Sequence, residues 1–340
     1  MSDRTSSMFS LNRLPDRITN SIDVIDPDVV HLHWIGAGYV RPESLANIDR
    51  PLVWTLHDMW PFTGGCHYSY DCDKYENTCN RCPLLNSSQE EDPSYDLHMR
   101  KKKTWKSLDI TLISPSYWLA DCARESSLFD DADIHIVRNG IDTSEFKPIP
   151  KRSARRSLDL PKSKKIILFP GGLSGTSRKG PQFVRELLGE NWKGFSPLLV
   201  TFGGSKRPTE VSDWSLKVNR LGYLSDEELK MAYSAADLLL VPSLADNQPN
   251  TILESMACGT PCVAFESGGI PEMICHKKDG YLTERESVKD LQRGIEWLID
   301  DHKRLGRVSE NARRTVVEEF SLPKSVESHQ KLYSKIAPHD

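Results

Sequence analysis

Residues 238–265 read LLLVPSLADNQPNTILESMACGTPCVAF, and this stretch decides the fold class. It begins with a short apolar run, continues through a polar loop, and ends in a second apolar run. Pro249 suits the first position of a helix, because the N–H that proline lacks would have no partner there. Gly259 suits the position after a helix, where a left-handed backbone is common. The stretch therefore predicts a strand, a helix over 249–258 and a second strand.

The same alternation of apolar runs and helix-like segments occurs along the whole chain. Further strands are predicted at 28–33, 51–57, 109–114, 133–137, 166–169 and 198–203. Strands that alternate with helices favour parallel sheets, so we predict an α/β protein with two Rossmann-like domains that face each other across a ligand-binding cleft. The predicted parts are an N-terminal domain over 1–145, a linker over 146–164, a C-terminal domain over 165–322, and a helix over 323–340 that packs back on the N-terminal domain.

Length and charge exclude several classes of protein. The chain has 340 residues, enough for two domains, and a formal net charge of −4. That charge argues against binding to nucleic acid by neutralisation of phosphates. No apolar run approaches the roughly 20 residues that a transmembrane helix needs. The polar N-terminus lacks the apolar segment of a secretory signal, so we predict a cytoplasmic protein. Peripheral contact with the inner face of the plasma membrane is a second expectation.

The loop and helix start of the opening stretch carry the candidate binding residues. Asn250, Thr251 and Ile252 offer backbone N–H groups at a helix N-terminus, where unpaired donors and the helix dipole attract a diphosphate. Asp246 and Glu254 lie on either side of this helix start. Carboxylates beside a phosphate site would repel the ligand unless they accept hydrogen bonds from its hydroxyl groups. We therefore expect these two acids to bind sugar or ribose hydroxyls.

These residues resemble the donor-site signature of the family 4 retaining glycosyltransferases, which have the GT-B fold. The signature is an acid, seven residues and a glutamate, followed here by SMACGTPCVA at 255–264 and GGIPE at 268–272. The segments DNQPNT and LHDMWPFTGGCHYS are most similar to the subgroup that builds exopolysaccharides such as colanic acid. The resemblance covers nearly the whole chain.

The resemblance also implies roles for residues outside the signature. Arg178 and Lys179, followed by a glycine, resemble the loop that binds the donor diphosphate. Asn139 begins an NGID segment similar to the interdomain element of the family, and Gly222 lies where the nucleotide base is expected. His57, within WTLHD, matches the N-domain histidine placed near the reacting sugar. The residues expected to act in catalysis are His57, Asp246 and Lys179.

The activity implied is transfer of a sugar from a UDP- or GDP-sugar to a hydroxyl of a glycan or lipid-linked acceptor, with retention at the anomeric carbon. Basic side chains and the helix N-terminus would meet the charge of the leaving diphosphate, so we expect no cofactor for catalysis. Two alternatives stay open: a nucleotide-sugar-binding protein without turnover, and a UDP-sugar epimerase of a related two-domain fold. The epimerase leaves the pair of acids and the CGTP segment at 258–261 unexplained.

The N-terminus departs from the family pattern. About 27 residues precede the first predicted strand, and they contain no Gly-rich loop. The family has a strand and a Gly-rich loop in this region, so we expect the N-terminal domain to lack its first βα unit. The runs at 29–33 and 52–56 are apolar enough to be central strands with neighbours on both sides.

Four of the eight cysteines lie close together in the sequence, at Cys66, Cys72, Cys79 and Cys82. Clustered cysteines in a chain without a secretory signal more often bind metal than form disulfides. We expect the loop over 62–92 to have little hydrophobic core of its own, so we predict that a structural Zn²⁺ ion held by the four sulfurs stabilises it. Disulfide bonds and free thiols are the alternatives.

A basic run, RKKK at 100–103, is followed by Trp105 and Lys106. Such a run can contact an anionic membrane that presents a lipid-linked acceptor. The alternative interpretation is a helix face that is simply exposed to solvent.

Overall fold

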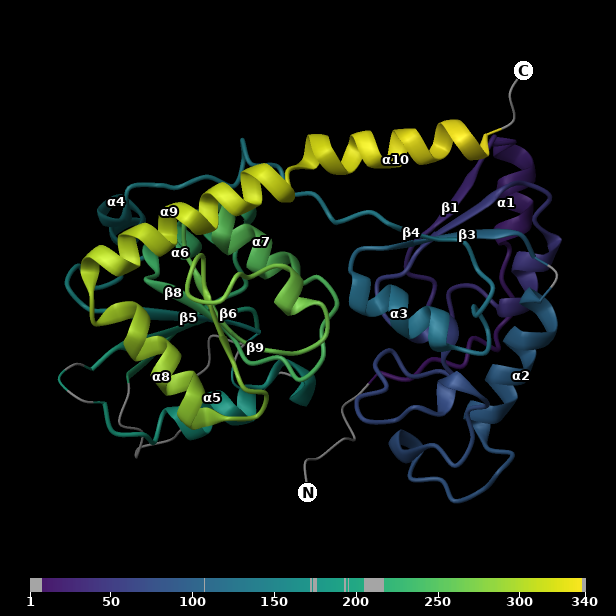
Figure 1. The fold of residues 1–340 in the computed structure, drawn as a ribbon, viewed down its shortest axis with the longest axis horizontal. Coiled ribbons are helices and arrows are strands. Elements are labelled where there is room, and N and C mark those ends of the chain that lie inside the picture. Colours follow the sequence, from purple (N-terminus) through teal and green to yellow (C-terminus); the bar gives the residue numbers. More distant parts are fainter. Residues whose placement is uncertain are drawn as a thin grey trace. The chain divides into compact units, whose positions relative to one another are not determined.

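The chain divides into two compact units, each an α/β domain with its own parallel sheet (Figure 1). The first unit comprises residues 1–138 and 326–340, and the second comprises residues 139–325. Within these bounds the computed structural model describes residues 8–106, 108–171, 173, 176–192, 194, 196–204 and 217–337.

The first unit contains a four-stranded sheet in the order β1-β2-β3-β4. Its strands are β1 (Val30–Leu32), β2 (Leu52–Thr55), β3 (Ile110–Ser114) and β4 (Ile134–Ile136). Its helices are α1 (Ile18–Ile25), α2 (Pro93–Trp105) and α3 (Tyr117–Glu125), with 3-10 turns at Pro42–Asn47, Trp60–Phe62, Lys74–Glu76 and Pro83–Leu85. In the described part of this sheet β1 forms an edge, whereas β2, the other strand apolar enough to be central, has β1 and β3 on its two sides.

Both faces of this sheet are covered, because successive residues of a strand point to opposite sides. Trp54 of β2 lies in a large core with Leu97 of α2. Val53, its neighbour in the strand, packs on the other face with Leu332 of helix α10 (Leu322–Ile336). The part of α10 from Val326 onward therefore contributes to the core of the first unit.

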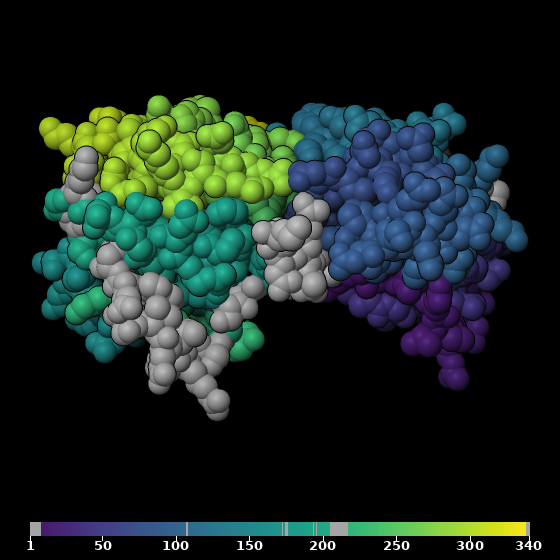
Figure 2. All heavy atoms as spheres, turned by 90° about the horizontal axis from the view of Figure 1, so that it is seen from below, coloured from purple at the N-terminus to yellow at the C-terminus, as the bar shows by residue number. Residues whose placement is uncertain are grey.

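The loop over 62–92 lies between β2 and α2. In Figure 2 this loop is blue, and it covers much of the visible face of the first unit. Phe62 and Tyr75 pack their rings with centroids 5.6 Å apart, and both side chains are buried. The loop thus has more core than its sequence suggested.

The second unit contains a six-stranded parallel sheet in the order β10-β9-β8-β5-β6-β7. Its strands are β5 (Ile166–Pro170), β6 (Leu198–Phe202), β7 (Lys217–Gly222), β8 (Leu238–Val241), β9 (Cys262–Phe265) and β10 (Tyr281–Thr283). The chain adds strands first on one side of β5 and then, from β8 onward, on the other. In open α/β sheets ligands bind at such a switch point, outside the carboxyl ends of the strands.

Helices cover both faces of the second sheet. They are α4 (Lys151–Ser157), α5 (Pro181–Leu187), α6 (Asp226–Ala235), α7 (Asn250–Ala257), α8 (Val288–Ile299) and α9 (His302–Glu319), with 3-10 turns at Ser177–Lys179 and Ile270–Glu272. Figure 1 shows α5 and α8 on one side of the sheet and α6, α7 and α9 on the other. Leu168 of β5 packs with α6, α7 and α9, and Ile167 packs with α5 and α8.

The segment predicted as a linker, 146–164, belongs to the second unit. It contains α4, and Arg155 of this helix is only 4% exposed. The Arg155 guanidinium donates to Asp237 Oδ2 at 2.9 Å and to the carbonyl of Ala235 at 2.9 Å. A basic composition suggested a solvated linker, but the buried ion pair makes this segment part of the domain.

Candidate functional site

The residues predicted to bind a donor diphosphate meet at the switch point of the second sheet. Lys179 follows β5, and Asp246 follows β8. Lys179 Nζ lies 2.6 Å from Asp246 Oδ2, and Arg178 Nη1 lies 3.3 Å from Asp246 Oδ1. The Asp246 side chain is 8% exposed, whereas that of Lys179 is 37% exposed. The site therefore consists of a buried carboxylate with two partly exposed cations, of which Lys179 is the more exposed.

Two glycines allow the chain to pack tightly around Asp246. Gly180 has φ +76°, and a Cβ there would lie 1.9 Å from the carbonyl oxygen of Pro242. Gly268 has φ +55°, and a Cβ there would lie 2.0 Å from the carbonyl oxygen of Asp246. The same oxygen accepts a hydrogen bond from Gly269 N at 3.0 Å. Residues with side chains could not approach so closely, so Gly180 allows close packing against the start of the loop that carries Asp246, and Gly268 allows it against Asp246 itself.

Helix α7 begins one residue later than predicted. Pro249 has extended backbone angles and is the N-cap, and Asn250 is the first helical residue. Ile252 N donates to the carbonyl of Pro249 at 3.0 Å, which closes a tight first turn. The prediction that Ile252 offers its N–H to a ligand is therefore corrected, and the N-terminal donors of α7 reduce to Asn250 and Thr251.

Glu254 lies in the second turn of α7 and is half-buried. The hydroxyl of Tyr233, on α6, donates to Glu254 Oε2 at 2.6 Å. Burial raises the pKa of Glu254, the bond from Tyr233 lowers it, and the charge of Asp226 raises it further. The net pKa lies above that of an ordinary glutamate. Tyr233 was not among the predicted site residues, since it lies on a different helix from Glu254.

Asn139 contacts the loop that precedes α7. Its N–H donates to Gln248 Oε1 at 2.6 Å, and Gln248 is itself buried. Gln248 was not among the predicted residues, and a polar residue before a proline gave only a weak signal. Gly222 ends β7 at the same edge of the sheet, and its carbonyl accepts a hydrogen bond from Gly203 N at 2.7 Å.

In the first unit, three histidines line the carboxyl ends of β1 and β2. His57 Nε2 lies 2.9 Å from His33 Nδ1, and their rings stack with centroids 5.2 Å apart. His31 bonds to Thr55 Oγ1 at 2.8 Å and to the hydroxyl of Tyr333. Burial lowers the pKa of all three imidazoles, that of His31 to about 4. Neutral imidazoles can both donate and accept hydrogen bonds at pH 7.

None of the four clustered cysteines is paired in a disulfide. Gly64 N donates to Cys79 Sγ at 3.1 Å, and burial raises the pKa of the Cys79 thiol to about 12. Burial also raises the pKa of Cys66 and of Cys82, so these thiols stay protonated at neutral pH. Within the residues that the structure describes, no group of three or more His, Cys, Asp or Glu side chains is placed to hold a metal ion. The structural Zn²⁺ ion therefore stays a prediction without support from this arrangement.

Comparisons with known proteins match both units. A profile described as Glycosyltransferase Family 4 matches residues 3–145, and one described as Glycosyl transferases group 1 matches residues 150–315. The D-inositol 3-phosphate glycosyltransferase of Corynebacterium jeikeium is 32% identical over 92% of this chain and 73% of its own length. The chain belongs to the glycosyltransferases of the group 1 and family 4 type.

A second relative of this glycosyltransferase is Escherichia coli WcaC, whose name associates it with colanic acid biosynthesis. It is 27% identical over 78% of this chain, and the match spans about two thirds (66%) of its own length. The solved structure of Anabaena HepE with UDP-glucose has a TM-score of 0.65 and 19% identity, and it covers 93% of this chain and 81% of the other. At this identity the likeness concerns the fold. The predicted fold class, GT-B with two Rossmann-like domains, is confirmed.

The basic run of the glycosyltransferase is less exposed than its sequence suggested. Lys101 is fully buried, and its Nζ donates to the carbonyls of Trp60 and, at 2.9 Å, of Thr63. Arg100 Nε lies 2.7 Å from Glu43 Oε1. Trp105 is buried as well, so the exposed part of the run consists of Lys102, Lys103 and Lys106. In the described part of the chain, no helix is both long and apolar enough to cross a membrane.

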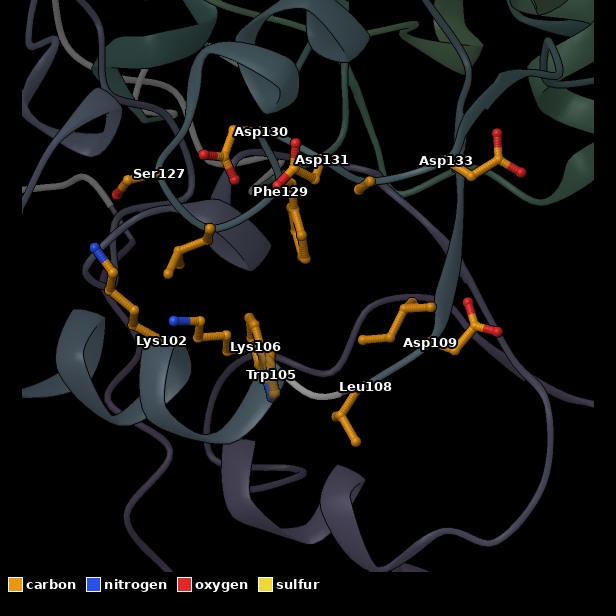
Figure 3. Close-up of a pocket in the computed structure, with 13 residues that line it drawn as sticks. Lys102, Trp105, Lys106, Leu108, Asp109, Ser127, Phe129, Asp130, Asp131 and Asp133 are labelled. Carbon is orange, nitrogen blue, oxygen red and sulfur yellow. The ribbon is translucent and has the colours of Figure 1, made fainter.

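A hollow of about 550 Å³ opens in the first unit at the amino ends of β3 and β4. Figure 3 shows Lys102 of α2 and Lys106, the residue after this helix, extending into the hollow, with Phe129, Asp130 and Asp131 on the opposite wall. Its size would admit a small molecule. It lies at the opposite edge of the sheet from His57, however, and ligands of parallel sheets bind at the carboxyl edge. We therefore do not include it in the candidate site.

Proposed function

We propose that this glycosyltransferase moves a sugar from a nucleotide-diphosphate sugar to a hydroxyl group of a glycan or lipid-linked acceptor. The observation that carries the proposal is the ion pair of Lys179 and Asp246 at the switch point of a Rossmann-like sheet. The helix that follows, α7, adds N-terminal N–H groups and the carboxylate of Glu254. UDP is the first nucleotide to test, because the similar fold of Anabaena HepE was solved with UDP-glucose, and GDP is the second.

Lys179 is the residue that we propose meets the diphosphate. Its side chain is 37% exposed, so its ammonium can exchange an oxygen of Asp246 for a phosphate oxygen without leaving its loop. Arg178 also donates to the carbonyl of Ala245 at 2.8 Å, so it stays near Asp246 during this exchange. Negative charge on the diphosphate grows as it leaves, so a fixed cation stabilises the transition state more than the bound donor.

The proposed reaction retains the configuration at the anomeric carbon. The bond between that carbon and the diphosphate oxygen breaks, and the acceptor oxygen forms a bond on the same face of the sugar. The proton of the acceptor hydroxyl passes to the leaving phosphate oxygen. Asp246 accepts hydrogen bonds from sugar hydroxyls, Glu254 accepts them from the ribose, and His57 acts beside the reacting sugar, as the family resemblance implies.

The proposed pathway is assembly of an exopolysaccharide. The support is the likeness to WcaC at 27% identity over about two thirds of that protein, so the pathway is a narrower proposal than the reaction class. Transfer in such a pathway would take place on a lipid-linked glycan at a membrane surface. The exposed side chains of Lys102, Lys103 and Lys106 could contact such a surface. Lys101 and Trp105 could not, because both are buried.

The test is an assay of nucleotide release with a panel of UDP- and GDP-sugars and glycan acceptors. We expect one donor to release its nucleotide faster when acceptor is present, and proton NMR of the product to show the anomeric configuration of the donor. Lys289→Ala, which removes an exposed lysine of α8, is the control and should match the parent. Binding without release would favour a nucleotide-sugar-binding protein, and interconversion of donor epimers would favour an epimerase.

A further inference from the structure

Tyr233 and Glu254 form a side-chain pair that joins two helices. Tyr233, on α6, is completely buried, and its hydroxyl donates to Glu254 Oε2 at 2.6 Å. Glu254, on α7, is only half-buried. A carboxylate offers about four acceptor positions on its two oxygens. One bond from Tyr233 therefore leaves Glu254 free to accept further hydrogen bonds on its exposed side.

The Tyr233 hydroxyl is held in place by its surroundings. Its ring packs edge-on against Phe202 at the end of β6, with centroids 5.7 Å apart and an interplanar angle of 83°. Its carbonyl accepts a hydrogen bond from Thr260 Oγ1 at 2.7 Å. A side chain fixed in this way can fix the orientation of the acid that it contacts.

We propose that Tyr233 is a positioning residue for donor binding, which holds the Glu254 carboxylate in the orientation and charge state that accept the two ribose hydroxyls of the nucleotide. The inference rests on the proposed function, since it assumes that Glu254 meets the ribose. Two adjacent hydroxyls are well matched to one carboxylate, provided that the carboxylate is ionised and cannot rotate away.

The surroundings of Glu254 explain why its ionisation needs support. Burial and the charge of Asp226 raise its pKa, and the hydroxyl of Tyr233 is the group that lowers it. The thiol of Cys258 also interacts with Glu254, but burial raises the pKa of that thiol to about 12, so it stays neutral. Removing the Tyr233 hydroxyl should therefore raise the pKa of Glu254. The protonated acid would then donate one hydrogen bond where two must be accepted.

The experiment measures UDP affinity by calorimetry between pH 5 and pH 8 in the full chain and in Tyr233→Phe. We expect the substitution to weaken binding about three- to tenfold at pH 7, the usual net contribution of one hydrogen bond, because the lost bond orients the acid and does not itself contact UDP. We also expect the acid limb of the affinity profile to move to higher pH. A role in packing alone would lower the melting temperature and leave the acid limb in place. Tyr281→Phe is the control, because it removes another buried tyrosine hydroxyl of the same unit, one that contacts Arg293.

Glu254→Gln separates the two levels of the proposal. If this variant weakens UDP binding and Tyr233→Phe leaves both affinity and pH profile unchanged, the role of Tyr233 is wrong and the donor site stands. If Glu254→Gln leaves the affinity unchanged, or the parent binds neither UDP nor GDP, the ribose role of Glu254 fails and the inference fails with it.

Discussion

Lys179 Nζ lies 2.6 Å from Asp246 Oδ2, and the carboxylate in this pair is much more buried than the ammonium. The backbone of the acid packs tightly against Gly268, and the loop that carries it packs against Gly180 at Pro242, whereas the lysine side chain is 37% exposed. A diphosphate that approaches the switch point would compete with Asp246 for Lys179. We expect the exchange to leave the Asp246 carboxylate available to sugar hydroxyls.

Lys179→Ala should lower kcat by about a hundredfold, the usual cost of losing one group that stabilises the charge of the transition state, and should raise KM much less. The reason is that the charge on the diphosphate grows as it leaves. Steady-state kinetics with the best donor of the panel provides the measurement. Kinetics equal to those of the parent would remove Lys179 from the mechanism, and Lys289→Ala controls for the loss of an exposed lysine.

Asp246→Asn should separate nucleotide binding from sugar transfer. The substitution keeps the shape of the side chain and removes a negative charge beside the proposed diphosphate site. UDP should bind as tightly as to the parent or severalfold more tightly, while transfer should fall at least about tenfold. Calorimetry and the transfer assay test the two halves separately. Loss of UDP affinity with normal turnover of bound donor would contradict the sugar-binding role.

Gly180→Ala should destabilise the second unit and reduce transfer. A Cβ at this position would lie 1.9 Å from the Pro242 carbonyl, and the left-handed backbone adds strain, so we expect a loss of about 1–3 kcal/mol in the free energy of unfolding. Gly306→Ala is the matched control, since Gly306 lies in the second turn of α9 and a Cβ there meets no atom within 4 Å. That change should stabilise the protein by about 1 kcal/mol. Urea unfolding of both variants checks the contrast, and equal effects would refute it.

The second sheet could be predicted from sequence where its strands are apolar on both faces. The run at 166–169 became β5 (Ile166–Pro170), and the run at 261–265 became β9 (Cys262–Phe265). The pattern missed β7 (Lys217–Gly222), because this edge strand is largely polar. The three-residue β10 was too short to give a periodic signal.

The candidate site could be predicted only where its residues lie close together in the sequence. Asp246 and Glu254 stand out because one loop and one helix carry both. Tyr233 could not be found, because its contact with Glu254 depends on how α6 packs against α7. The burial of Lys101 was also not predicted. Four consecutive basic residues suggested one exposed face, but successive residues of a helix point in different directions and Lys101 points into the core.

Lys101→Met should change the pH dependence of stability. Burial lowers the pKa of Lys101 to about 7 from 10.5, so between these values the unfolded chain binds the extra proton. The parent should therefore gain stability relative to the variant as the pH rises from 7 to 8.5, at up to about 1.4 kcal/mol per pH unit. Urea unfolding of both proteins across this range measures the difference. A difference that does not change with pH would show that Lys101 is charged in the folded state.

The central claim is that Lys179 and the start of α7 bind the diphosphate of a nucleotide sugar. The most direct test compares, by calorimetry, the affinities of UDP and uridine, and of GDP and guanosine, for the parent chain and for Lys179→Ala. The account predicts that one of the two diphosphates binds the parent at least about a hundredfold more tightly than its nucleoside does. In Lys179→Ala this ratio of affinities should fall about tenfold, while the affinity for the nucleoside stays the same. Equal affinities for nucleotide and nucleoside in the parent, or an unchanged ratio in the variant, would contradict it.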